Sequence, residues 1–193
     1  LKKKDEMVLA LAKEIEMRKS EFQDEIVETI YFGGGTPSIL QIADLKFLID
    51  AVYKNYKVVE NPEITVEANP DDLTETRIIE LSKNKVNRLS IGIQSFFEDD
   101  LQLMNRAHNV EEAKKCLEIA THYFDNISID LIYGVPEMSN EKWLQNIETA
   151  LSFGVPHISS YALTVEPKTA LHSFIQKGII PQPDDEVAQE HFH

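Results

Sequence analysis

Two periods of apolar residues alternate along this chain. Short apolar runs, alternating with polar positions, predict strands at Thr29–Phe32, Ile64–Ala68, Leu89–Gln94, Ile127–Tyr133 and Ile158–Val165. Apolar residues three or four positions apart predict helices near residues 5–20, 41–55, 97–104, 110–123, 140–153 and 169–177, and Thr74 is a good N-cap for one more. Since each predicted strand is followed by a helix, the pattern predicts a parallel sheet built by repeated right-handed crossovers.

The two faces of the predicted strands differ, and the difference separates two folds that share this element order. A doubly wound sheet with helices on both faces should be apolar on both. Here one face is bulky and aliphatic, with Ile64, Val66, Leu89, Ile91, Ile93, Ile127, Ile129, Leu131, Tyr161, Leu163 and Val165. The other is small and polar, with Thr65, Glu67, Ser90, Gly92, Gln94, Ser128, Asp130, Ser160, Ala162 and Thr164. Because closed eight-stranded barrels are filled by branched apolar side chains, we expect a wider, partial (open) β/α barrel around a polar cavity.

Composition narrows the class of protein further. The 193 residues fit one domain, and we interpret residues 1–193 as a single α/β domain without an internal linker. The net charge of −14 argues against nucleic-acid binding, which needs clustered Lys and Arg. No apolar stretch approaches the roughly 20 residues that span a bilayer. The single cysteine, Cys116, excludes an internal disulfide and suits a reducing compartment, so we expect a cytoplasmic protein.

The most distinctive segment is the run Gly33-Gly34-Gly35, which follows the first predicted strand and precedes Thr36. A strand-to-helix turn without Cβ atoms lets backbone N–H and C=O groups approach a ligand closely. A tight turn without any ligand would use the same residues, so the run needs support from elsewhere in the sequence.

Four polar side chains are expected at the same edge of the sheet as the glycine run. Glu67, Gln94 and Asp130 each lie near the carboxyl end of a predicted strand, where parallel β/α folds build their sites. Arg106 follows on the connection after Gln94. Two carboxylates, an amide and a guanidinium suit a zwitterionic ligand that carries hydroxyl groups, with Arg106 binding its carboxylate. We identify no convincing nucleophile–base pair, so a hydrolase is not expected.

Structural interpretations of the same residues stay open. Glu67 and Asp130 are also consistent with buried carboxylates that pair with Arg88. Gln94 is also consistent with a core amide, and Arg106 with a surface side chain. A barrel enzyme whose glycine loop binds a phosphorylated metabolite is a further functional alternative.

Other conspicuous residues are expected to be structural. The histidines are scattered without metal-ligand spacing, and His191 and His193 are expected to have no specific role. Trp143, Ile147 and Leu151 recur at helical spacing, so we expect them in the core.

Several longer stretches resemble the radical S-adenosylmethionine (SAM) proteins of the oxygen-independent coproporphyrinogen III oxidase family. The similarity covers nearly the whole chain, in the family's order and spacing, through Tyr31–Ser38, Ile64–Pro70, Arg88–Phe96 and Asn126–Pro136. Two more stretches, Asn105–Asn109 and Pro156–Pro167, resemble the haem chaperone branch of that family.

This resemblance implies a fold, two cofactors and a set of binding residues. The family's fold is a partial six-stranded β/α barrel of the TIM type, of which this chain would supply about five strands. Its cofactors are SAM and a [4Fe–4S] cluster held by three cysteines, and haem is a further candidate ligand. Carried onto this sequence, the SAM-binding residues are Gly34, Gly35, Thr36, Glu67, Gln94, Arg106, Asp130 and Ala162. The glycines and Thr36 would hold the methionyl part of SAM, and Ala162 would lie near its adenosyl group.

The chain departs from the family at the cluster. The family's Cys-x3-Cys-x2-Cys motif is not in the sequence, and Cys116 alone cannot supply three thiolates. We therefore expect a fragment of a longer protein, without the first strand, cluster loop and C-terminal domain, and inactive by itself. We expect the longer protein to be a haem chaperone that binds SAM, the cluster and haem, and passes haem to an acceptor that the sequence does not identify. The alternative is an enzyme, an oxygen-independent coproporphyrinogen III oxidase that converts propionates of a porphyrinogen to vinyl groups.

Overall fold

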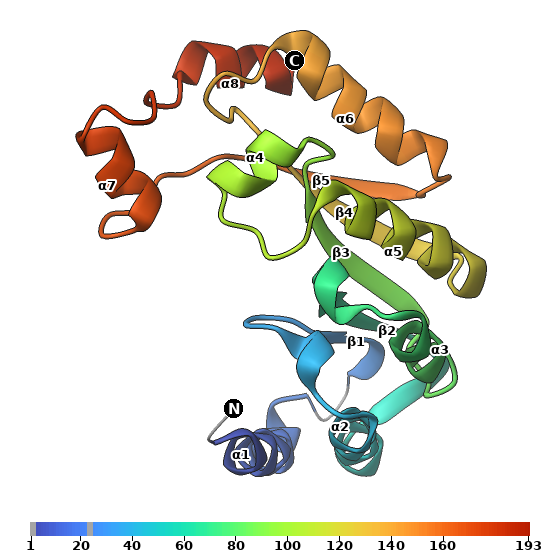
Figure 1. Cartoon of the computed structure of the whole chain (residues 1–193). Coiled ribbons are helices and arrows are strands. Elements are labelled where there is room, and N and C mark those ends of the chain that lie inside the picture. The colour runs from blue at the N-terminus through green and yellow to red at the C-terminus, as the bar shows by residue number, and fades with distance from the viewer. Residues whose placement is uncertain (1–2, 23–24) are drawn as a thin grey trace.

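Five parallel strands form one sheet whose spatial order follows their order in the chain. The computed structural model describes residues 3–22 and 25–193, and the strands pair in the order β1-β2-β3-β4-β5. They are β1 (Ile26–Phe32), β2 (Lys57–Ala68), β3 (Arg88–Gln94), β4 (Asn126–Tyr133) and β5 (His157–Ala162). The sheet curves into a half-barrel, visible as an arc from β1 to β5 in Figure 1. The expected partial β/α barrel is confirmed.

Helices connect the strands and lie mainly along the convex side of the arc, where Figure 1 shows α2, α3, α5 and α6. The α-helices are α1 (Lys4–Met17), α2 (Ile42–Asn55), α3 (Glu75–Ser82), α4 (Glu98–Leu103), α5 (Val110–Tyr123), α6 (Asn140–Ser152), α7 (Ala170–Gln176) and α8 (Asp185–Phe192). The Thr74 hydroxyl accepts a hydrogen bond from the Arg77 N–H (3.2 Å), so the predicted N-cap of α3 is confirmed.

The core lies between these helices and the aliphatic face of the central strands. Val66 in β2, Leu89 and Ile91 in β3, and Ile129 and Leu131 in β4 are all 0% exposed. Removing such side chains from water is the main favourable contribution to folding, at roughly 25 cal/mol per Å² of apolar surface. The concave face is therefore free to carry polar groups, as the alternation in these three strands predicts.

The face assignment of β5 is wrong. Its register places Ser159 opposite Asp130 and Ala162 opposite Tyr133. Because directly paired residues of neighbouring parallel strands point to the same face, Ser159 and Tyr161 lie on the polar concave side, and Ala162 on the helix-covered side. The strand is shorter than predicted, ending at Ala162, and most of its residues are exposed at the edge of the sheet.

Two further expectations fail near the C-terminal end of the described chain. Leu151 is 58% exposed, whereas Trp143 of the same helix is 7% exposed and belongs to the core as predicted. His191 was expected to have no specific role, yet it is buried and joins α8 to the end of β4. Its Nδ1 accepts a hydrogen bond from the Gly134 N–H (3.1 Å), and its carbonyl oxygen accepts one from Trp143 Nε1 (2.9 Å).

Candidate ligand-binding site

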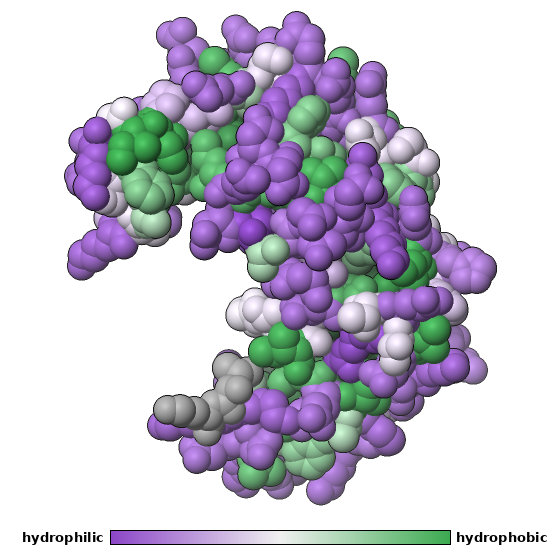
Figure 2. All heavy atoms as spheres, in the orientation of Figure 1, coloured by the Kyte–Doolittle hydropathy of each residue, from purple (hydrophilic) through white to green (hydrophobic). Residues whose placement is uncertain are grey.

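A polar cavity lies at the carboxyl edge of β2, β3 and β4, on the concave side of the half-barrel. The hollow measures about 170 Å³ and is lined by Gly35, Thr36, Pro37, Glu67, Ala68, Asn69, Ser90, Gly92, Gln94, Arg106 and Asp130. Figure 2 shows the molecule hollowed between the two ends of its arc. Of the eight residues expected to bind the ligand, Gly35, Thr36, Glu67, Gln94, Arg106 and Asp130 therefore line one cavity.

Glu67 holds the glycine loop at one wall of this cavity. One carboxylate oxygen accepts a hydrogen bond from the Gly34 N–H (2.9 Å), and the other accepts one from the Tyr31 hydroxyl (2.9 Å). Gly34 and Gly35 have φ angles of 79° and 66°, a backbone region that residues with a Cβ rarely adopt. A Cβ on Gly33 would come within 2.9 Å of Glu67 Oε1. The glycines are therefore required for the loop to fold against Glu67 and to expose its backbone to the cavity.

The alternative pairing of Glu67 with Arg88 is not realised. Arg88 instead lies 3.9 Å from Glu63 and donates to the Thr65 hydroxyl (3.4 Å). Burial raises the pKa of the Tyr31 hydroxyl, and its hydrogen bond to Glu67 raises it further. Tyr31 therefore stays protonated and can donate to Glu67 near neutral pH.

Gly92 forms the floor of the cavity beneath two of the predicted residues. A Cβ at this position would lie 2.7 Å from Gln94 Nε2 and 3.4 Å from a guanidinium nitrogen of Arg106. The absence of a side chain at Gly92 leaves room for the Gln94 amide over β3, whereas a Cβ there would only touch Arg106 at an ordinary contact distance. The guanidinium of Arg106 donates to Asn69 Oδ1 (2.8 Å).

Arg106 is positioned to bind an anionic group of a ligand. Among the described residues, no carboxylate lies within the 4.0 Å of an ion pair with its guanidinium. Burial lowers the pKa of Arg106, because the charged guanidinium is removed from water. A half-buried cation without an ion-pair partner gains free energy when a carboxylate approaches it.

Asp130 faces the same cavity from β4 and has a raised pKa. Burial is the main cause, and the negative charge of Glu67 raises the pKa further, while His157, Arg88 and Arg106 oppose the shift. Two carboxyl groups in one half-buried cavity suit a ligand with hydroxyl and ammonium groups. The carboxylate oxygens accept hydrogen bonds from these groups, and a positive charge on the ligand offsets the repulsion between the two carboxylates.

Two of the eight expected residues stand apart from the cavity lining. Gly34 is turned toward Glu67 through its N–H, directly beside Gly35. Ala162 lies at the end of β5 on the face opposite to Asp130, so its methyl group points away from the concave side. Any contact of Ala162 with a ligand would therefore have to come from its backbone.

Sequence reasoning missed Tyr31, Asn69 and Ser90 as members of the site. Asn69 directly follows the last residue of β2 and lines the cavity, where it accepts the hydrogen bond from Arg106. Its signal was available, since it follows Glu67 by two residues at a strand end. Ser90 pairs with Glu67 in register, which follows only from the strand alignment.

The residues of this chain do not fit an iron–sulfur cluster. Cys116 is the single cysteine of the sequence, and it is buried in α5, where burial raises the pKa of its thiol to about 12. No group of three metal-ligating side chains occurs among the residues that the structure describes. Since a [4Fe–4S] cluster needs three or four thiolates, such ligands would have to come from outside these residues.

Fold and site together define an α/β half-barrel protein with a polar ligand cavity at the carboxyl ends of its strands. The model of the radical SAM superfamily matches residues 3–150, and the chain belongs to this superfamily. It is 37% identical over 188 residues to the haem chaperone HemW of Bacillus subtilis, covering 96% of this chain and 50% of that protein. It is also 37% identical over 165 residues to the mouse protein named radical S-adenosyl methionine domain-containing protein 1, mitochondrial, covering 85% and 37%.

A solved structure supports the same placement. Coproporphyrinogen III oxidase (HemN) from Escherichia coli, described as a radical SAM enzyme, superposes with a TM-score of 0.80 at 27% identity, covering 96% of this chain and 44% of that chain. The chain is thus a radical SAM protein of the HemW/HemN group and spans half or less of the length of these relatives. Among the described residues, no helix is both long and apolar enough to cross a membrane.

Proposed function

We propose that the cavity at the carboxyl edge of β2–β4 binds SAM. The observation that carries the proposal is the half-buried guanidinium of Arg106, which faces the cavity without an ion-pair partner among the described residues. SAM combines an α-amino acid, a sulfonium cation and a ribose, so it offers a carboxylate, positive charge and hydroxyl groups. The cavity offers groups complementary to these, since a guanidinium and two carboxyl groups line it together.

The proposed roles follow from the chemistry of each lining residue. Arg106 binds the carboxylate of SAM, and the backbone of Gly34, Gly35 and Thr36 holds its methionyl part. Glu67 and Asp130 attract the ammonium and sulfonium charges or accept from the ribose hydroxyls, and Gln94 completes the pocket. Ala162 contributes its backbone at the adenosyl end. SAM bound beside a cluster supplies radical chemistry, and the cluster ligands would be supplied from outside these 193 residues.

We further propose that the longer protein containing this chain is a haem chaperone located in the cytoplasm. Relatives named haem chaperones are 37% and 34% identical over 96% and 93% of this chain, in Bacillus subtilis and Escherichia coli. The mouse relative of similar identity is named as mitochondrial, so the compartment that we propose depends on the organism of origin. Haem and a haem acceptor protein are then the partners, and the oxidase activity of a HemN-like enzyme is the competing outcome.

Calorimetric titration of the chain with SAM tests the binding site. Arg106→Met should weaken SAM binding about tenfold or more, because one charge-assisted contact to a carboxylate is lost. The matched control is Arg18→Met, since Arg18 is an exposed arginine whose ion pairs among the described residues are with Glu14 and Glu21 of its own segment. Equal affinities of both variants, or no binding of SAM to the unmodified chain, would overturn the proposal.

Haem binding separates the two activities of the longer protein. The full-length protein, purified anaerobically with its cluster, should bind haemin stoichiometrically in an absorbance titration and leave coproporphyrinogen III unchanged. Production of 5′-deoxyadenosine together with decarboxylated porphyrinogen would instead establish the oxidase.

A further inference from the structure

β3 ends in a strained turn centred on Gln94. The Ser95 N–H donates to the Ile93 carbonyl oxygen (2.9 Å), two residues back, and Gln94 has a φ angle of 68°. An i to i+2 hydrogen bond around a central residue of positive φ is the rare, strained form of the γ-turn. The register of β3 against β4 is also irregular between Ile91 and Gln94. This turn sets the direction of the Gln94 side chain over Gly92 and into the cavity.

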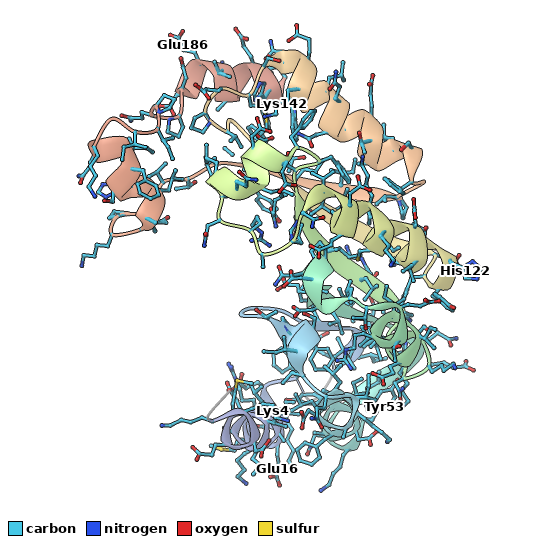
Figure 3. All side chains as sticks on the ribbon, in the orientation of Figure 1. Lys4, Glu16, Tyr53, His122, Lys142 and Glu186 are labelled. Atoms are coloured by element: carbon cyan, nitrogen blue, oxygen red, sulfur yellow. The ribbon has the colours of Figure 1, made fainter. Side chains whose placement is uncertain are left out.

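A non-glycine residue keeps such a conformation only when its surroundings hold it there. On the far side of the turn, the Phe96 N–H donates to Asn146 Oδ1 of α6 (2.6 Å), and the Ser95 hydroxyl donates to Asp100 Oδ2 (2.7 Å). Lys142 of α6, labelled in Figure 3, forms an ion pair with Asp100 of α4 (2.6 Å). These contacts fix the backbone that follows Gln94.

On the near side, the turn is held by His108. Its Nε2 lies 3.1 Å from the carbonyl oxygen of Ile93, the same oxygen that closes the γ-turn. A carbonyl oxygen only accepts hydrogen bonds, so the proton of the imidazole resides on Nε2. The His108 side chain is 0% exposed. Its Nδ1 is buried and has no hydrogen-bond partner among the described residues, and Asp71 Oδ1 lies 3.8 Å away.

His108 also lies two residues after Arg106, on the same short connection between α4 and α5. One buried ring therefore joins two arms of the cavity: the turn that presents Gln94 and the segment that presents Arg106. The first arm lies at the last residue of β3 and the second lies between α4 and α5, so the His108 contact ties the end of a strand to an irregular segment.

We infer that His108 is a positioning residue that fixes Gln94 and Arg106 relative to each other for ligand binding. This inference rests on the proposed SAM site and adds a residue to it that touches no ligand. The carbonyl of Ile93 is the link, because it receives hydrogen bonds from both the turn and the imidazole. A hydrogen-bond donor at the place of Nε2 is the property that matters, rather than a ring or a charge.

Two substitutions isolate that property. His108→Leu keeps an apolar side chain of similar size but removes the donor, whereas His108→Gln retains an N–H₂ group near the position of Nε2. The matched control is Trp143→Phe, which also removes a buried side-chain donor to a backbone carbonyl, that of His191, at a place outside the cavity lining. All three variants are compared with the unmodified chain at a temperature well below their unfolding.

Calorimetry with SAM and hydrogen exchange of the Ser95 amide are the two measurements. In His108→Leu, SAM affinity should fall about tenfold and the Ser95 amide should exchange faster. In His108→Gln both quantities should return to within about threefold of the unmodified chain, and Trp143→Phe should change neither despite its loss of stability.

The outcomes separate this inference from the proposed function. If the unmodified chain does not bind SAM, the proposed function fails, and the SAM-directed role of His108 fails with it. If the unmodified chain binds SAM but His108→Leu binds equally well, only the inference is overturned. An equal loss of affinity in Trp143→Phe would also overturn it, because general destabilisation would then explain the effect.

Discussion

The central strands β3 and β4 and the edge strand β5 belong to the same sheet but follow different rules. In β3 and β4 one set of alternate residues is buried in the core, and Ser90, Gly92, Gln94 and Asp130 of the other set line the cavity. In β5 most residues are exposed, and two aromatic or polar residues, Tyr161 and His157, lie on the concave side. A strand between two neighbours is fixed by burial on one face, whereas an edge strand is fixed mainly by its hydrogen-bond register.

This contrast predicts that equal substitutions in the two regions have unequal costs. Ile91→Ala in β3 should lower the free energy of unfolding by about 3–4 kcal/mol. Ile91 is 0% exposed, so its removal leaves a void in the core in addition to the loss of buried apolar surface. Ile158→Ala in β5 should cost about 1 kcal/mol, since Ile158 is only half-buried. Urea unfolding measures both. Similar losses would show that β5 is held as firmly as the central strands.

Substitutions at two glycines provide the next test. The one at Gly92 should weaken ligand binding, and the one at Gly178 should lower only the stability of the fold. Gly92→Ala should weaken SAM binding about tenfold, because its Cβ would push the Gln94 amide away from the cavity floor. Gly178 has a φ of 68° and open space around it, so Gly178→Ala should cost roughly 1 kcal/mol of stability and leave binding unchanged. Calorimetry and urea unfolding on both variants give the comparison. Normal SAM affinity in Gly92→Ala would contradict the assigned floor.

The raised pKa of Asp130, in the central strand β4, predicts that the stability of the fold depends on pH. Its pKa is raised above the ordinary 3.8, so the folded chain holds this proton more tightly than the unfolded chain. Stability from this group is therefore present at low pH and is lost as pH rises from about 3.8 through the raised pKa of the folded state. Asp130→Asn avoids that loss, so its stability advantage without ligand should grow from acid pH to neutrality. The same variant should bind SAM more weakly. An advantage that shrinks as pH rises would contradict a raised pKa.

The smallest expected effect concerns Ala162. Its methyl group points to the helix-covered side of β5, so Ala162→Val should change SAM affinity by less than about twofold. Calorimetry decides this point. A large loss would mean that the side chain reaches the ligand and that β5 adopts another register when the ligand is bound.

The sequence was sufficient where the contrast between the two faces was strong. Leu89, Ile91 and Ile93 alternate with Ser90, Gly92 and Gln94, so the faces of β3 and the inward position of Gln94 follow from periodicity. In β5, neither set of alternate residues in His157–Ala162 is clearly apolar. A shift of one position then reverses every side chain, and only the register against β4 decides.

Contacts between residues far apart in the chain also could not be predicted from the sequence. His191 is buried because α8 returns to the end of β4, and Asn146 reaches the turn after Gln94 from a helix 50 residues further along the chain. His108 lies in a segment that the sequence singled out, but its bond to Ile93 depends on the shape of the γ-turn. No spacing rule predicts that an imidazole will meet one particular carbonyl oxygen, so these residues became visible only in the folded chain.

The most direct test of the SAM site is an amide NMR titration of the isotopically labelled chain with SAM. The account predicts that the largest shifts fall on Gly34, Gly35, Gly92 and Gln94, at the carboxyl edge of the central strands. Amides of α7 and α8 should stay unchanged. Shifts confined to those helices and β5, or no shifts at all, would contradict the assignment of the cavity as the SAM site.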